Sequence, residues 1–174
     1  MRSSQSKLFV ALTVAMACVP AASHSAVAPH APEVAVTILP SKLDIPVDAQ
    51  AAVLVVDSFG KALAAVDFKT VENLLDPSVI ILESGGAERS REEYMSRHAV
   101  ADALFLGNAH VALQRRTARV DGVTAWVASE SEIHASDDGK PMTLLSTETM
   151  ILHKSTDGWR IVHIHWSSRR KKDA

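Results

Sequence analysis

Apolar residues recur at helical spacing in the first half of the chain. Asp48 can cap a helix, and one apolar stripe follows at intervals of three and four residues: Ala52, Val56, Phe59, Leu63 and Val66. Asp67 opens a shorter helix that ends before Pro77, since the residue before a proline disfavours helical geometry. Two consecutive helices are therefore expected between residues 48 and 76.

A third helix is predicted from a capping box. Ser90 is followed three residues later by Glu93, the pattern in which each side chain satisfies a backbone amide at a helix start. The apolar stripe of this helix would hold Tyr94, His98, Ala101 and Phe105, and Gly107-Asn108 would end it.

The pattern then changes to the two-residue alternation of β-strands. One strand is expected at 79–84, before the turn Gly85-Gly86, and four more at 109–120, 123–134, 142–154 and 159–167. Asp-Gly pairs at 121–122, 138–139 and 157–158 are strong hairpin signals. The sequence therefore predicts one α+β domain, in which three helices precede a long antiparallel meander.

Strand alternation predicts which side chains share a face. The strand at 142–154 places Ser146, Glu148, Met150 and Leu152 on one side. The last strand places Val162, Ile164 and Trp166 on one side, and Trp159, Ile161, His163 and His165 on the other. The helices would cover one face of the curled meander, and the amphipathic outer face favours contact with a second subunit. We expect a homodimer.

The N-terminus has the layout of a secretory signal peptide over residues 1–25. Two basic residues precede an apolar run at 8–19 and small residues at 21–25, and the run is too short to span a bilayer. Cleavage would change the net charge from −2 to −4 and remove the only cysteine, Cys18. The alternative is lipoprotein processing at Cys18. Either route predicts a periplasmic or secreted protein.

The remaining regions and the composition set further limits. Residues 26–47 contain four prolines and predict an extended tether, and the basic residues of 169–174 predict a solvated tail. The chain of 174 residues is 47% hydrophobic and 22% charged, which is typical of a globular protein. Its slight negative charge supplies no attraction to nucleic acid, and we expect neither a nucleic-acid partner nor a transmembrane segment.

The order of elements over residues 48–168 resembles the nuclear transport factor 2-like superfamily, in its SnoaL-like branch. The chain is also similar to the association domain of calcium/calmodulin-dependent kinase II at 139–141, 146–149, 157–159 and 161–165. The resemblance implies a cone-shaped curved sheet around a pocket that three N-terminal helices close. Family members include isomerases, dehydratases, polyketide cyclases and non-enzymatic assembly domains. Arginines enter the pocket of the kinase domain, and the matching positions here are Met150 and Trp166.

Glu148 is the first candidate for a functional residue. On a central strand between Ser146 and Met150, its carboxyl group would lie in apolar surroundings, and desolvation would raise its pKa toward neutrality. A carboxyl group in that state can exchange protons with a substrate. The alternative is a structural carboxylate that Arg115 or Arg119 satisfies.

Three further candidates belong to the predicted third helix and one to the first strand. His98 and Asp102 are four residues apart and could form a general base with its orienting group, or an ordinary surface ion pair. Three alternative roles are open for Tyr94, the only tyrosine: proton donor, ligand anchor or core aromatic residue. Glu83 would line the pocket mouth.

The His163-x-His165 pair is the weak candidate for a metal site. Strand geometry places the two rings on one face about 7 Å apart, and a third ligand such as His134, His153 or a glutamate would have to come from elsewhere. Structural histidines at a subunit contact are the favoured interpretation, and we expect no metal and no cofactor.

These observations predict an exported domain that binds a small, largely apolar molecule or serves assembly. The alternative is a cofactor-free isomerase, dehydratase or hydrolase that uses Glu148, His98 and Asp102, with Tyr94, Glu83, Ser146, Met150 and Trp166 around the ligand. A periplasmic metal-binding protein is the lesser alternative.

Overall fold

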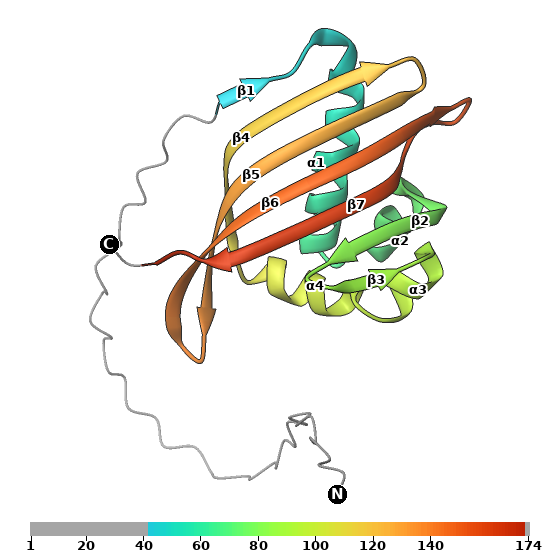
Figure 1. The fold of residues 1–174 in the computed structure, drawn as a ribbon. Helices are drawn as coiled ribbons and strands as arrows, with labels where there is room; N and C mark the ends of the chain where they lie inside the picture. The colour runs from blue at the N-terminus through green and yellow to red at the C-terminus, as the bar shows by residue number, and fades with distance from the viewer. Residues whose placement is uncertain (1–41, 173–174) are drawn as a thin grey trace, which may run out of the picture. The chain divides into compact units, whose positions relative to one another are not determined.

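The computed structural model describes residues 42–172 (Figure 1). The predicted signal peptide and residues 26–41 of the predicted tether lie outside the described residues. The elements are β1 (Lys42–Asp44), η1 (Val47–Ala49), α1 (Gln50–Ala64), α2 (Phe68–Leu74), β2 (Leu75–Glu83), β3 (Gly86–Glu88), α3 (Arg91–Ser96), α4 (Ala99–Gly107), β4 (His110–Asp121), β5 (Thr124–Asp137), β6 (Lys140–Ser155) and β7 (Gly158–Arg170).

The strands form one curled sheet in the order β1-β4-β5-β6-β7-β2-β3, and α1 crosses its inner face (Figure 1). β4 to β7 are the predicted antiparallel meander, and the hairpin between β5 and β6 turns at Asp138 and Gly139, both with positive φ. Two pairings were not predicted: β2 lies parallel to β7, and β1 lies parallel to β4. The α+β class is confirmed, with a mixed sheet.

The first two helices differ from the prediction mainly at their ends. Asp48 lies inside the 3-10 turn η1, and α1 begins at Gln50. Val66 follows α1 with a φ of 59° and is exposed, because the chain reverses there toward α2. Asp67 caps α2 as expected, since its side chain accepts from the Thr70 amide at 3.1 Å.

The prediction of one continuous third helix is wrong, because two short helices, α3 and α4, occupy this region. Ser90 caps the helix as predicted, because its hydroxyl accepts from the Glu93 amide, and the Glu93 carboxylate accepts from the Arg89 amide. However, α3 stops at Ser96 and α4 begins at Ala99. The break at Arg97 and His98 changes the helical phase. The buried residues are therefore Tyr94, Ala99 and Ala103, while His98, Ala101 and Phe105 are exposed.

The core lies between α1, α2 and the inner face of the sheet. Its largest fully buried side chains are Tyr94, Phe59, Leu63, Leu75, Ile81, Met150, Leu152, Ile161, Ile164, Val71, Val79 and Val127. Gly107 ends α4 against α1, where an added Cβ would lie 3.0 Å from the Ala64 carbonyl oxygen. A side chain at this position would separate the two helices.

A bulge in β7 changes the predicted faces of that strand. Register shifts between the pairs Ile151–His163 and Leu152–Ile161, so Val162 is the extra residue. Ile161 and Ile164 are consequently both fully buried. The prediction that Ile161 shares the outer face with His163 is wrong, because alternation cannot continue through a bulge.

Both ends of the described region belong to the sheet, over residues for which the sequence predicted no strand. β1 lies within the predicted tether, and Asp44 accepts a hydrogen bond from Arg119 at 2.5 Å. β7 continues to Arg170, which pairs with Asp137, and Lys171 donates to Glu132 at 2.6 Å. Residues 169–171 are therefore held by these contacts, which the prediction of a free basic tail did not include. In residues 42–172, every helix is too short or too polar to cross a membrane.

Candidate functional site

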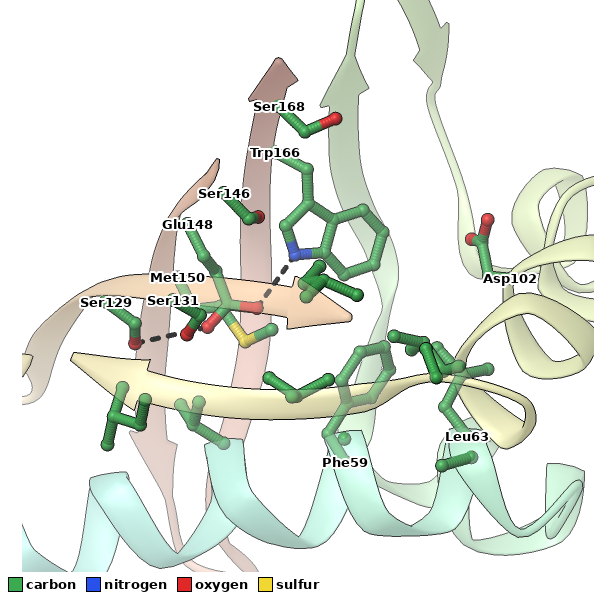
Figure 2. A pocket seen from close by; sticks show the side chains of 18 of the residues that line it. Phe59, Leu63, Asp102, Ser129, Ser131, Ser146, Glu148, Met150, Trp166 and Ser168 are labelled. Carbon is green, nitrogen blue, oxygen red and sulfur yellow. Dashed lines mark hydrogen bonds between the residues drawn. The ribbon is translucent and has the colours of Figure 1, made fainter. Parts of the chain in front are cut away.

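A cavity of about 510 Å³ lies between the inner face of the sheet and helices α1 and α4 (Figure 2). Its apolar lining comes from both layers: Val56, Phe59, Leu63, Leu106, Val111, Leu113, Ile133, Leu144, Met150 and Trp166. Its polar lining includes Asp57, Lys61, Glu83, Asp102, Arg116, Ser129, Ser131, Ser146 and Glu148. The hollow is thus largely apolar, with a few polar groups at defined places.

Glu148 projects from β6 into this cavity, on the face that alternation predicts. Its carboxyl group accepts hydrogen bonds from the Trp166 indole nitrogen at 2.8 Å and from the Ser129 hydroxyl at 3.4 Å (Figure 2). Burial raises the pKa of the Glu148 carboxyl, while the Trp166 bond and the nearby Arg116 charge oppose that rise. The site therefore favours a proton on Glu148 over a wider pH range than water does.

Arg116, rather than the expected Arg115 or Arg119, is the arginine near Glu148. It is buried, donates from Nε to Ser129 at 3.1 Å, and pairs through Nη1 with Asp57 of α1 at 2.5 Å. β4 shifts register between Leu113 and Arg115, so Arg116 turns inward after the bulge. Strict alternation could not reveal this. Arg115 instead faces Glu130 in an exposed pair.

Asp102 lines the cavity from α4 and accepts a hydrogen bond from the Tyr94 hydroxyl at 2.9 Å. Burial raises the pKa of the Asp102 carboxyl, and the Tyr94 bond partly opposes this rise. Burial raises the Tyr94 pKa as well, so this hydroxyl stays protonated and acts as a donor. Tyr94 itself is 1% exposed and packs behind the cavity lining, with its ring centroid 6.4 Å from that of Trp166.

His98 does not form the predicted pair with Asp102. Because the helix breaks beside it, the His98 ring contacts the buried carboxyl group of Glu88 on β3. Sequence reasoning missed Glu88, which is 4% exposed at the end of a strand too short to show alternation. His98 is thus exposed and lies outside the cavity lining, and Asp102 faces the cavity with Tyr94 as its partner.

Four other predicted pocket residues, Glu83, Ser146, Met150 and Trp166, line the cavity. Burial, followed by the nearby Asp102 charge, raises the pKa of the Glu83 carboxyl at the cavity rim. Trp166 stacks on Phe59 with ring centroids 6.2 Å apart. The prediction missed Ser129. Alternation along β5 places Ser129 on the face opposite to Trp126 and Glu130, which is the inner face, so the pattern could have identified it.

The two histidines of the weak metal hypothesis lie on β7 away from the cavity. The His163 Nδ1 atom is 2.9 Å from the Ile80 carbonyl oxygen on the neighbouring strand β2, and His165 is exposed. Within residues 42–172, no cluster of three or more histidine, cysteine, aspartate or glutamate side chains is suited to hold a metal ion.

A family model described as a SnoaL-like domain matches residues 54–170, which include the whole cavity lining. The chain belongs to the SnoaL-like family. Its fold is that of nuclear transport factor 2-like proteins, as the resemblance implied. The search of curated proteins finds no match to this SnoaL-like domain.

Solved structures extend this comparison. A protein from Shewanella frigidimarina, provisionally named a ketosteroid isomerase, is 34% identical, with a TM-score of 0.66 over 71% of this chain and 98% of its own. The CaMKII hub of S. rosetta is 23% identical, with a TM-score of 0.62 over 69% and 95% of the two chains. A protein from Streptomyces avermitilis, provisionally named a dehydratase of the NTF2-like family, is 23% identical, with a TM-score of 0.57 over 70% and 96%. The last two likenesses establish the shared fold.

The SnoaL-like cavity can support two kinds of chemistry. A protonated Glu148 can donate a hydrogen bond to a ligand oxygen, and its ionised form can accept a proton from carbon or oxygen. Asp102, with Tyr94 as its donor, provides a second carboxyl group of raised pKa at the helical side. Both groups line the same cavity.

Proposed function

We propose that this domain binds a small, largely apolar molecule in its cavity, with Glu148 as the polar contact. The observation that carries the proposal is a buried carboxyl group facing a hollow of about 510 Å³. Ligand cavities typically have volumes of roughly 300–1,000 Å³, apolar walls and a few convergent polar groups.

Filling the cavity tests this proposal. The Ser146→Trp variant places an indole in the hollow, while Thr147→Trp places one on the exposed side of the same strand. We expect calorimetric titration with 1-decanol to show binding to the wild type and to Thr147→Trp, with at least a tenfold loss in Ser146→Trp. Circular dichroism would establish that both variants are folded. Equal binding in the two variants would contradict a ligand site in this cavity.

A second candidate function is cofactor-free acid–base catalysis, in which a double bond moves relative to a carbonyl group. The raised pKa of Glu148 supports it, as does the 34% identity to the protein provisionally named a ketosteroid isomerase. Ionised Glu148 would take a proton from the carbon beside the carbonyl, and protonated Glu148 would return it to the far carbon of the resulting enolate. Asp102 lies at the other side of the cavity (Figure 2) and would contact a part of the substrate remote from the reacting carbons.

This mechanism predicts that Glu148→Gln removes turnover. The amide keeps the shape of the side chain but cannot carry the proton. The assay follows, by absorbance, the movement of the double bond of an unsaturated ketosteroid into conjugation with its carbonyl group. The rate of this reaction should fall at least a thousandfold. Glu130→Gln, on the exposed outer face, is the matched control. Turnover retained in Glu148→Gln, or absent from the wild type, would contradict the catalytic proposal and leave ligand binding unaffected.

We also propose that the outer face of the sheet is a dimer contact. Register pairs place Ile80, His163, Ile151 and Trp126 in one row across β2, β7, β6 and β5. Ile80 and Trp126 are 46% and 40% exposed, so the row presents two large apolar side chains, with His163 between them, to a second copy. Light scattering should give the mass of two chains for the wild type and of one chain for Trp126→Glu. A wild-type mass of one chain would contradict the proposal.

Export is proposed from the N-terminal pattern alone. Cell fractionation should recover the protein outside the cytoplasm with a mature N-terminus near residue 26. Recovery in the cytoplasm, with residues 1–25 still attached, would overturn the proposal.

A further inference from the structure

The polar groups of the cavity fall into two separate sets. The first set, here called the sheet pole, consists of Glu148, Ser129 and Arg116 on the central strands. The second, the helix pole, consists of Asp102 on α4 and Glu83 at the end of β2. Both sets line one cavity, so a single ligand can reach both.

The charged and polar groups that surround the two poles differ. The groups that act on Glu148 are Trp166, Arg116, Ser129 and Asp57. The groups that act on the helix pole are Tyr94, His98 and Glu88, together with the repulsion of Glu83 by Asp102. Each pole therefore has its own electrostatic surroundings, as expected for groups at opposite sides of a hollow.

Trp166 spans the apolar distance between the poles. Its indole nitrogen donates to Glu148 at 2.8 Å, while its ring lies near Tyr94, whose hydroxyl reaches Asp102. Figure 2 shows the indole between Glu148 on one side and Asp102 on the other. Phe59 and Leu63 of α1 also lie along this middle section (Figure 2). A ligand that contacts both poles must therefore be apolar between its ends.

The charge of the lining disfavours an anion. In the described region, four acidic residues line the cavity (Asp57, Glu83, Asp102 and Glu148), against the two basic residues Lys61 and Arg116. Arg116 is already paired with Asp57 at 2.5 Å, and Lys61 is exposed on α1. A ligand carboxylate at either pole would face carboxyl groups. Neither of the two basic lining residues offers it a buried positive charge that is free to pair with it.

We propose that the cavity takes an elongated, uncharged molecule with a hydrogen-bonding oxygen at each end, and that it rejects the corresponding carboxylate. One oxygen contacts Glu148 and the other contacts Asp102. A ligand hydroxyl can donate to an ionised carboxylate or accept from a protonated one, and the apolar body lies along Trp166. This inference rests on the proposed binding function and specifies its ligand class.

Three probes with the same carbon chain test the inference: 1-decanol, 1,10-decanediol and 10-hydroxydecanoate, with diols of neighbouring lengths to match the separation of the poles. In calorimetric titrations at neutral pH, the best diol should bind about three- to tenfold more tightly than its mono-alcohol, the gain typical of one added hydrogen bond. The hydroxy-carboxylate should bind at least tenfold more weakly than the diol.

Charge removal at the helix pole supplies the matched variant. The penalty on the hydroxy-carboxylate is the ratio of its Kd to that of the diol. In the Glu83→Gln/Asp102→Asn double variant, this ratio should shrink at least threefold, because the amides keep hydrogen-bonding capacity without negative charge. Glu92→Gln, an exposed residue of α3, is the control and should leave the penalty unchanged.

The possible failures are distinguishable. If the carboxylate binds as tightly as the diol, or if no diol exceeds its mono-alcohol, the two-pole inference is overturned and ligand binding in the cavity stands. If none of the probes binds, the binding function itself is overturned, and this inference falls with it.

Discussion

The two halves of strand β6 meet the helices in different ways. At one end, Leu152 is fully buried and belongs to a core that α1 and α2 cover, and Met150, 1% exposed, lies at the boundary between this core and the cavity. Two residues further back on the same face, Glu148 and Ser146 line the cavity. The inner face of one strand is therefore solid at one end and hollow at the other.

Side-chain size and polarity explain the difference. The packed half carries branched aliphatic residues from several strands, among them Val79, Ile161 and Ile164, which fill the space beneath the helices. The hollow half carries small or polar residues at equivalent inward positions, among them Ser129, Ser131 and Ser146. The cavity thus follows in part from a change in residue type along β5 and β6, whose pairing stays regular.

The packed half should be the more sensitive to truncation. Leu152→Ala leaves a void among fully buried side chains and should lower the free energy of unfolding by about 2–5 kcal/mol. Ser146→Ala, on the same face in the hollow half, should change it by less than about 0.5 kcal/mol. Urea denaturation of both variants measures the contrast, and equal losses would remove the distinction between the halves.

Arg116 is expected to matter most for the stability of the hollow half. Arg116→Gln leaves Asp57 without its cation and Ser129 without its donor, which should cost about 1–3 kcal/mol. Arg115→Gln, its exposed neighbour, should cost less than about 0.5 kcal/mol. If the two variants lost equal stability in denaturant titrations, the inward role of Arg116 would be wrong.

Glu148 should make stability depend on pH. Its pKa is raised in the folded protein, so its stabilising contribution is fully present below the unfolded pKa and is lost as pH rises through the folded pKa. Glu148→Gln should therefore flatten the decline in melting temperature that the wild type shows above the ordinary carboxyl pKa of 4.5. The exposed Glu130→Gln should retain this decline. An unchanged slope in Glu148→Gln would refute the raised pKa.

The smallest expected effect is a gain in stability at the cavity wall. Gly60 lies inside α1, and a Cβ there would meet open space among the described residues. Gly60→Ala should therefore raise the free energy of unfolding by about 0.5–1 kcal/mol, since alanine has the higher helix propensity. Gly107→Ala should lower it, because its Cβ would press on the Ala64 carbonyl. Thermal melts of the pair would show opposite shifts, and shifts of the same sign would contradict the packing described.

Several site features could be predicted because they depend on local alternation within regular strands. Ser146, Glu148 and Met150 share the inner face of β6, whose pairing with β5 is regular throughout. The Asp67 cap and the Ser90 capping box were likewise predictable from neighbouring residues. The Glu88 contact of His98 was not, since it joins residues on different elements after an unpredicted helix break.

Local periodicity was enough to predict the α+β class, the four-stranded meander and the inward direction of Glu148, because periodicity is set by residues a few positions apart. The three-dimensional structure was needed to show that Arg116 turns inward, that Ile161 is buried, and that Asp102 takes Tyr94 as its partner. Bulges and a helix break shift the register of every later residue in an element. The packing of distant segments stabilises these irregularities, so local patterns carry little information about where they occur.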